Sequence, residues 1–482
     1  MKIYLLNPPY FPHFGREMRW QNTGRGGTLY YPIWLAYATA LLKKAEFDVK
    51  LVDAIARNWD VEAVINDMAL FSPEMVVIVT SFTSLTNDIK IAQQIKNKLN
   101  KLLVMVGPPT SHFSAKILDS GIDVVVRNEY DFTLVDLANH IQSGKPIGDV
   151  QGVSFVRDNV ICDNPNRPWS TTNMLDNIPF VSETYKKHLN IRDYFLSYSL
   201  YPMVQIFGGR GCPYQCTFCS WPQSFTGKKY RIRNIANILD EIKWIENNLS
   251  FVKEVFFEDD TFTIDQQRVR QFCEQYCVRG LKLSWSCNAR VGTLDLETMR
   301  AMKKANCRFV IVGFESANDD ILLNIKKKIT VSEARIFASN AKKSGLFLHA
   351  DFIIGLPGET KATINNTWLF IKEIKPDQLQ ISVASPFPGT EFYDWAKTNG
   401  YLVTDNPNEY LDERGQQKSI ITYPGLNNEE IVKEVDRILK GYYFSLTYVP
   451  IALRQVLNRN GWYEFKRLWY SVTAFIRYIY HR

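Results

Sequence analysis

The sequence predicts an α/β protein with an N-terminal Rossmann-like domain, a central partial barrel of six β/α units and a mostly helical C-terminal region. Two observations support this prediction. Short β-branched and aromatic runs alternate with helical patterns through most of the chain, and the strand signals fade after Gly400. At 482 residues the chain is too long for one ordinary core, so we expect more than one domain.

Residues 1–143 are expected to form the first domain, because their strand-like runs are separated by helical patterns typical of a parallel sheet. Polar or turn-forming segments follow three of these runs, beginning at Asn7, Thr80 and Gly107. Ligands of open parallel sheets bind at this carboxyl edge, although strand ends need turn residues in any case. The strand-like runs are Lys2–Leu6, Val49–Val52, Met75–Thr80, Leu102–Val106 and Val124–Val126.

Residues 144–196 are predicted to be a linker with a small hairpin that turns at Asp158 and Asn159. Residues 197–400 then repeat a strand and helix pattern six times, which predicts an incomplete (β/α) barrel with its active site at the strand ends. The expected barrel strands are Val204–Phe207, Glu254–Glu258, Leu283–Cys287, Phe309–Phe314, Phe347–Ile354 and Gln378–Ala384. Helices are expected around Asn234–Asn248, Asp295–Ala305 and Val331–Ser344.

Residues 401–482 are expected to be helical and to end in an amphipathic helix. Aromatic residues beside Lys466, Arg467 and Arg477 suit contact with a membrane surface, and packing against the barrel is an equal alternative. The residues that share the apolar face of this helix are Phe465, Leu468, Trp469, Val472, Phe475, Ile476 and Ile479.

Composition excludes several classes of protein. A net charge of +7 is mild for this length, so no nucleic-acid partner is expected. The eight cysteines do not form the framework of a small secreted protein, and the N-terminus has no signal-peptide pattern. No apolar run approaches the roughly 20 residues of a membrane-spanning helix. We therefore expect a cytoplasmic protein.

Three cysteines, Cys212, Cys216 and Cys219, have the C-x-x-x-C-x-x-C spacing that suits three corners of one iron–sulfur cluster. Clusters normally take four thiolates, so three leave one iron open to a ligand. A structural zinc site or an electron carrier would need a fourth ligand, and no nearby pair supplies one. The spacing thus favours a catalytic cluster.

The motif, with Phe218 before its last cysteine, resembles the signature of the radical S-adenosylmethionine (SAM) superfamily. The resemblance implies a 4Fe-4S cluster and SAM, whose reductive cleavage gives a 5'-deoxyadenosyl radical that removes hydrogen from a substrate. It also implies positions at strand ends that bind SAM. Acidic groups would receive the methionine ammonium, with Asp260 preferred, and the other groups would receive the carboxylate, ribose and adenine. These positions are Phe218, Asp259, Asp260, Ser286, Asn288, Glu315 and Gly355.

The N-terminal domain resembles the cobalamin-binding domain of one radical SAM subclass. Matching segments include Tyr31–Ala36, Gly107-Pro-Pro-Thr and Arg127-Asn-Glu129-Tyr. The D-x-H-x-x-G motif that supplies a histidine ligand to cobalt is absent, so the resemblance leaves cobalamin occupancy open. Ser81, Thr83 and Gly107 would lie near the cofactor. His112 is interpreted as a turn or surface histidine rather than a cobalt ligand.

Segments along the whole chain, among them Arg231-Ile-Arg233 and Asn324-Ile-Lys-Lys327, resemble the hopanoid-biosynthesis radical SAM proteins linked to bacteriohopanetetrol cyclitol ether formation and the calditol synthases. The resemblance implies rearrangement or cyclisation of a membrane-lipid headgroup. It also implies an electron donor such as flavodoxin or ferredoxin, and peripheral membrane contact through the last helix. His349 is the candidate catalytic residue facing the substrate, and a satisfied core histidine is the alternative. A cobalamin-dependent methyltransferase, a porphyrin-ester cyclase and a non-catalytic cofactor carrier stay open.

Overall fold

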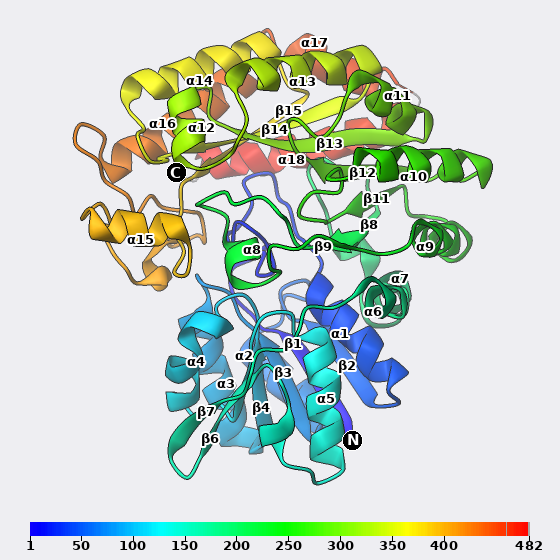
Figure 1. Cartoon of the computed structure of the whole chain (residues 1–482), viewed down its shortest axis with the longest axis vertical. Helices are drawn as coiled ribbons and strands as arrows, with labels where there is room; N and C mark the ends of the chain where they lie inside the picture. Colours follow the sequence, from blue (N-terminus) through cyan, green and yellow to red (C-terminus); the bar gives the residue numbers. More distant parts are fainter. Residues whose placement is uncertain (459, 481–482) are drawn as a thin grey trace.

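The computed structural model describes residues 1–458 and 460–480. Two sheets, one mostly and one entirely parallel, are stacked along the long axis of the molecule, with the N-terminal sheet at one end and the barrel at the other (Figure 1). The predicted fold class is confirmed.

The N-terminal sheet has the order β2-β1-β3-β4-β5-β6-β7. Strands β1 to β5 are parallel, and β6 and β7 continue the sheet as an antiparallel hairpin that turns at Asp158 and Asn159. The hairpin expected in the linker thus pairs with β5. These strands are β1 Lys2–Asn7, β2 Asp48–Asp53, β3 Met75–Val79, β4 Leu102–Val106, β5 Val124–Val126, β6 Val153–Arg157 and β7 Val160–Asp163.

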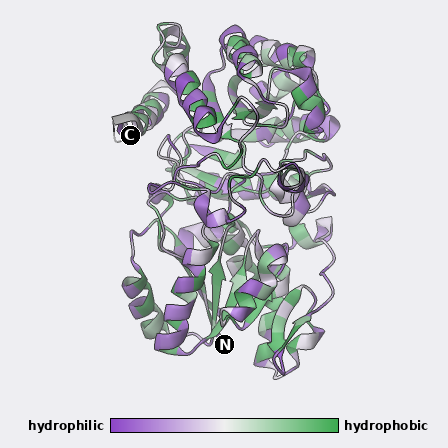
Figure 2. Cartoon of the chain, turned by 90° about the vertical axis from the view of Figure 1, so that its left-hand side faces the viewer, coloured by the Kyte–Doolittle hydropathy of each residue, from purple (hydrophilic) through white to green (hydrophobic). Residues whose placement is uncertain are grey.

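Helices lie on both faces of this sheet, which explains why β3 is an uninterrupted buried apolar run instead of an alternating one. Figure 2 shows the apolar strands between their covering helices. The helices are α1 Ile33–Lys44, α2 Val61–Phe71, α3 Leu85–Leu99, α4 Thr110–Asp119 and α5 Asp131–Gln142. Two short helices, α6 Thr172–Asp176 and α7 Val181–His188, lead to the barrel.

The barrel sheet has the order β15-β14-β13-β12-β11-β8 and is parallel throughout. It is an open barrel with β8 and β15 at its edges, as predicted. Its strands are β8 Met203–Ile206, β11 Glu254–Phe257, β12 Ser284–Ala289, β13 Cys307–Glu315, β14 Phe347–Ile354 and β15 Gln378–Val383. A short ribbon, β9 Gly209–Arg210 with β10 Arg231–Ile232, flanks the loop after β8.

Local sequence signals fix the ends of the barrel helices. In α13, the Thr330 side chain and Glu333 form a capping box, and Gly345 ends the helix with a φ of +77°. The helices are α8 Ser220–Ser224, α9 Ile235–Asn248, α10 Gln266–Val278, α11 Leu296–Lys304, α12 Asp319–Asn324, α13 Val331–Ser344, α14 Lys361–Ile374 and α15 Glu391–Thr398.

Three helices follow: α16 Asn428–Tyr443, α17 Val449–Val456 and α18 Gly461–Tyr480. The side of α18 that faces the barrel is polar, because Glu464 and Arg467 are fully buried there. Phe465 and Trp469 of the predicted apolar face are about half exposed. The side chain of Ile479 lies outside what the structure describes. No helix in the described part of the chain could cross a membrane. The predicted membrane contact stays a prediction.

Candidate active site

The three predicted cluster ligands lie on one loop between β9 and α8, at the carboxyl end of β8. The amide of Gln223 holds this loop, because its Nε2 donates to the carbonyl oxygens of Cys216, Thr217 and Cys219 at 3.2, 3.2 and 2.8 Å. The backbone N–H of Cys219 also donates to the carbonyl of Cys216 at 3.2 Å. The loop is therefore shaped by its own hydrogen bonds.

All three thiols line one cavity of about 140 Å³, together with Phe218. Among the described residues, no group of three His, Cys, Asp or Glu side chains converges as ligands of a single metal ion. Three thiols that line one cavity suit a cluster that keeps one iron open to a ligand. Burial raises the pKa of Cys212 to about 11 and raises that of Cys219 further. Loading of the cluster would thus release protons.

The two predicted carboxylates after β11 have different places. Asp260 lines the cavity and accepts hydrogen bonds from Gly211 N, Thr226 Oγ1 and Arg19 Nη2, each at 3.1 Å. Asp259 is fully buried outside the lining, and its Oδ1 accepts from Gly208 N at 2.6 Å. Burial raises the pKa of Asp259 to about 7. Asp260 is the carboxylate that can reach a ligand.

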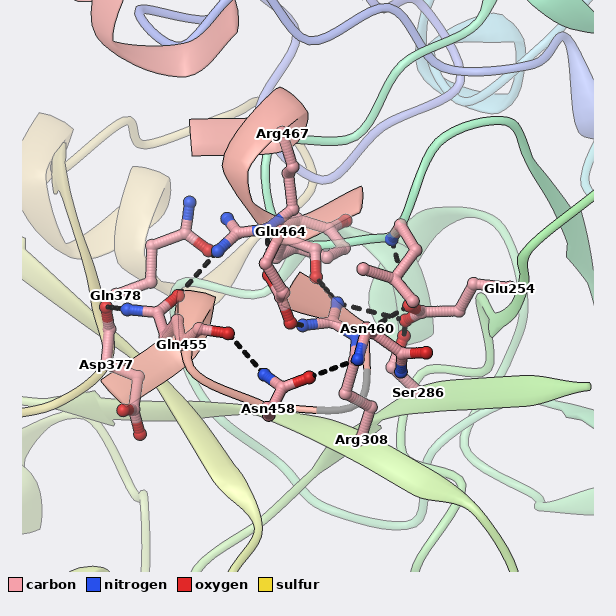
Figure 3. A network of polar contacts seen from close by, with 12 residues as sticks. Glu254, Ser286, Arg308, Asp377, Gln378, Gln455, Asn458, Asn460, Glu464 and Arg467 are labelled. Atoms are coloured by element: carbon pink, nitrogen blue, oxygen red, sulfur yellow. Dashed lines mark hydrogen bonds and ion pairs between the residues drawn. The ribbon is translucent and has the colours of Figure 1, made fainter. Parts of the chain in front are cut away.

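The two predicted residues of β12, Ser286 and Asn288, lie in different surroundings. Asn288 lines the cavity, and its Nδ2 donates to the carbonyl of Asp259 at 2.9 Å. Ser286 does not line it and instead donates to Glu254, which pairs with Arg308 (Figure 3). Two residues of a strand span roughly 7 Å, so Ser286 lies deeper in the barrel. Ser286 therefore does not line the cysteine cavity, and its predicted contact with SAM stays a prediction.

Glu315 lies at the end of β13 with a φ of +66° and lines the cavity beside Lys327. Lys327 Nζ lies 2.5 Å from Glu315 Oε1. Burial raises the pKa of Glu315, and the Lys327 ammonium opposes the rise. A Cβ on Gly313 would lie only 2.1 Å from Glu315 Oε1. Only glycine leaves room for this carboxylate.

Gly355 is outside the lining of the cysteine cavity. Its φ of +99° allows the turn after β14, and its carbonyl accepts a hydrogen bond from Tyr423 at 2.9 Å. The next residues, from Pro357 to Thr360, line a separate hollow of 450 Å³ that Thr217 of the cysteine loop also lines. Gly355 therefore shapes the turn beside the cysteine loop and stays a predicted SAM neighbour.

His349 is buried on β14, two residues before Asp351. Its Nε2 lies 2.9 Å from Asp351 Oδ1, and its Nδ1 lies 3.3 Å from Gln378 Oε1. Asp351 lines the cysteine cavity, whereas His349 lines a larger hollow on the other side. The His349–Asp351 pair thus lies between the cysteine cavity and the larger hollow. The catalytic role of His349 stays a prediction.

The carboxyl edge of the N-terminal sheet faces the carboxyl end of the barrel. Phe82, in the loop after β3, stacks on Phe387 beyond β15 with ring centroids 5.0 Å apart, and Phe387 lines the cysteine cavity. His112 lies against Gly389 of the same barrel loop. Ligands of both sheets would thus meet between the domains.

Ser81, Thr83 and Gly107 lie along this edge, covered by the segment that includes Gln21. The Ser81 hydroxyl lies 2.7 Å from that of Ser84, and Thr83 Oγ1 donates to the Gln21 carbonyl at 2.9 Å. Gln21 Nε2 is buried without a hydrogen-bond partner. Hydroxyl and amide groups of this kind fit a large neutral ligand rich in amides, such as cobalamin.

Sequence reasoning missed the cationic side chains of the cavity. Arg290 stacks on Tyr214 at 3.8 Å, its Nη1 donates to Cys216 Sγ at 3.6 Å, and its Nη2 is buried without a partner. Lys327 ends a segment that the sequence had already singled out, and Arg290 lies two residues after the predicted Asn288. Arg19 had no such signal, because it reaches Asp260 from the other domain.

Two families match this chain. Residues 206–371 match the Radical SAM superfamily, and residues 22–138 match the B12 binding domain. The chain contains a radical SAM domain and a B12-binding domain. It is therefore an enzyme that depends on a 4Fe-4S cluster and SAM, with cobalamin as a further cofactor.

Individual proteins similar to this radical SAM chain differ in how much of their length they share with it. It is 29% identical to an uncharacterized methyltransferase of Pyrococcus horikoshii, over 96% of both chains. It is 28% identical to the anaerobic magnesium-protoporphyrin IX monomethyl ester cyclase of Cereibacter sphaeroides, over 76% of this chain and 62% of the cyclase. Its fold is similar to that of the radical SAM methyltransferase TsrM from Kitasatospora setae, with a TM-score of 0.71, 16% identity and coverage of 98% and 99%.

Proposed function

We propose that this enzyme transfers a methyl group from cobalamin to a carbon atom of a small-molecule substrate. The observation that carries the proposal is geometric: the cysteine cavity lies where the carboxyl ends of the two parallel sheets face each other. A substrate there would be within reach of ligands on both domains. The match to the Pyrococcus methyltransferase over 96% of both chains also supports methyl transfer.

Each group of residues has a distinct task in this proposal. When bound, the cofactors would supply the electron that cleaves SAM and a transferable methyl group. Cys212, Cys216 and Cys219 hold the cluster. Asp260 receives the methionine ammonium, and the unpartnered Nη2 of Arg290 suits the methionine carboxylate. The Glu315 carboxylate, held by Lys327, suits the ribose hydroxyls.

The alternatives have weaker support. Rearrangement of a lipid headgroup rested on the resemblance to the hopanoid-biosynthesis proteins, whereas the Pyrococcus relative matched over nearly the whole chain is named a methyltransferase. The ester cyclase is longer, because this chain spans only 62% of it. A carrier without catalysis would not need a cavity lined by Asp260, Arg290 and Glu315 beside the thiols.

Label transfer tests the proposal. Anaerobically reconstituted enzyme with cobalamin, a low-potential reductant such as reduced flavodoxin, and methyl-deuterated SAM is incubated with extracts of cells that lack the gene. We expect one product that carries the label, together with S-adenosylhomocysteine and 5'-deoxyadenosine. Cys216→Ala should abolish all three signals. A rearranged product without label would contradict methyl transfer.

A further inference from the structure

A hollow of 520 Å³ lies beside the cysteine cavity, between β15, the segment Met18–Thr28 and the C-terminal helices α16, α17 and α18. The helices supply most of its apolar wall. Apolar side chains of this wall include Leu439, Tyr443, Leu453, Val456, Leu468 and Phe475. The hollow has room for a hydrocarbon chain.

The mouth of the hollow is marked by residues that both line it and face the outside. Val449 and Leu453 on α17 are each 52% exposed, and Val472 and Ile476 on α18 are 47% and 38% exposed. Water therefore meets an apolar rim here. Single apolar residues scattered over a surface are normal, but exposed apolar groups that continue into a cavity indicate a binding site for an apolar ligand.

The structure of α18 explains why its residues Val472 and Ile476 are partly exposed. The helix is held to the barrel by its polar side, where Glu464 Oε1 lies 2.8 Å from Arg308 Nη1 and Glu464 Oε2 lies 2.8 Å from Arg467 Nε (Figure 3). Arg467 also donates to the backbone of Ser197. On the apolar side of the helix, Phe475 packs on Tyr443 of α16 with ring centroids 5.6 Å apart, and the other apolar side chains line the hollow.

The inner end of the hollow lies beside the cysteine cavity. Trp20 lines both the hollow and the cysteine cavity, so the two spaces adjoin each other at this residue. His349 lines the hollow, and its partner Asp351 lines the cysteine cavity. A chain entering at the mouth would thus end beside the reacting groups.

The charges of the wall indicate which polar group the ligand carries. The described lining contains no acidic side chain, and Arg25 is its one permanent charge. Arg25 Nη1 donates to the carbonyl of Ile381 at 3.1 Å, and its Nε is buried without a partner. A guanidinium with spare donors suits a carboxylate or phosphate.

We propose that this hollow binds the methyl acceptor, an acidic amphiphile whose hydrocarbon chain packs between α17 and α18 and whose acidic group contacts Arg25. The identity of this ligand as methyl acceptor rests on the proposed function. Binding itself is measured without turnover, so a failure of methyl transfer and a failure of this proposal give different results.

The probe is cis-parinaric acid, a fluorescent fatty acid, titrated into anaerobically reconstituted full-length enzyme. We expect saturable binding that Val472→Asp weakens roughly tenfold, because a carboxylate at the mouth repels an acid and an apolar chain. The matched control is Trp469→Asp, which alters an exposed residue of the same helix outside the hollow. It should change the affinity less than about twofold.

The acidic group is tested with Arg25→Met. This variant should bind the acid roughly tenfold more weakly and the parinaric methyl ester as well as wild type. Unchanged SAM affinity shows that each variant is folded. The proposal is overturned if wild type does not bind the probe, if Trp469→Asp weakens it as much as Val472→Asp, or if Arg25→Met affects acid and ester equally.

Discussion

At the scale of single residues, ligand binding in the cysteine cavity depends on charged side chains that keep donors or acceptors available for the ligand. Asp260 shares its carboxylate with Arg19, whereas Arg290 keeps one nitrogen unpaired beside Cys216. An unpaired buried donor is costly and is retained where a ligand completes it. This makes Arg290 the most informative residue for SAM binding.

Arg290→Ala should weaken SAM binding by about 1.5 to 3 kcal/mol, the value of a hydrogen bond to a charged group. Equilibrium dialysis of anaerobically loaded enzyme measures the affinity, and iron content shows whether the cluster survives. Arg300→Ala, at an exposed position on α11, is the control. Equal affinities in both variants, with intact clusters, would remove Arg290 from the site.

Gly313→Ala should displace the Glu315 carboxylate, because the new Cβ would lie 2.1 Å from its Oε1. We expect a severalfold higher KM for SAM and an unchanged iron content, since no thiol contacts this position. Gly441→Ala is a matched control, because neither glycine has a positive φ and a Cβ at Gly441 meets only the Trp368 ring, at an ordinary contact distance of 3.4 Å. A KM that does not distinguish the two variants would contradict the assignment.

At the scale of elements, the strand and helix patterns were predicted well because their periods are local. β14 and α13 have the predicted bounds, and the other barrel strands differ by one or two residues at their ends. Helix α18 shows the limit of this approach. Its apolar stripe is real, but the packing side is polar because Glu464 meets Arg308, which is 156 residues away.

The pH dependence of this anchor can be predicted from Glu464. Burial alone would raise its pKa, but Arg308 and Arg467 hold the pKa below its ordinary value of 4.5. A depressed pKa means that the carboxylate stabilises the fold above about pH 4.5, and this stability is lost as the pH falls through the folded-state pKa.

Glu464→Gln should therefore cost about 3 to 5 kcal/mol at pH 7, because it leaves two buried guanidinium groups underpaired. The difference in unfolding free energy between wild type and variant should shrink below pH 4.5. Glu429→Gln, in an exposed pair with Lys433, should cost less than about 1 kcal/mol. A difference that does not change with pH would contradict the ion-pair explanation.

At the scale of the whole molecule, ion pairs between the domains hold the two sheet edges face to face. Glu129, beyond β5, accepts from Arg231 Nη1 at 2.7 Å and Nη2 at 2.6 Å. Asp131 accepts from Arg210 Nη2 at 2.7 Å. All four side chains are buried, so water does not weaken these contacts.

Glu129→Gln should loosen the domain interface at a cost of about 3 to 5 kcal/mol, because Arg231 is left without its charge partner. Hydrogen exchange should rise around β10 and the loop after β5, while β14 stays protected. Asp405→Asn, in the exposed pair with Lys397, is the control and should leave exchange at the interface unchanged. Protection at β10 equal to wild type would show that the pair does not join the domains.

The sequence by itself determined the places of the barrel strands to within one or two residues and singled out three cysteines as candidate cluster ligands, because thiol spacing and hydrophobic period are properties of neighbouring residues. It singled out the segments that contain Glu129 and Arg231, but not that they meet. Only the tertiary structure decided which strand-end residues face the cavity, which side of α18 is free, and which charges are paired. Those outcomes depend on side chains from distant segments, and their energies exist only after the chain has folded.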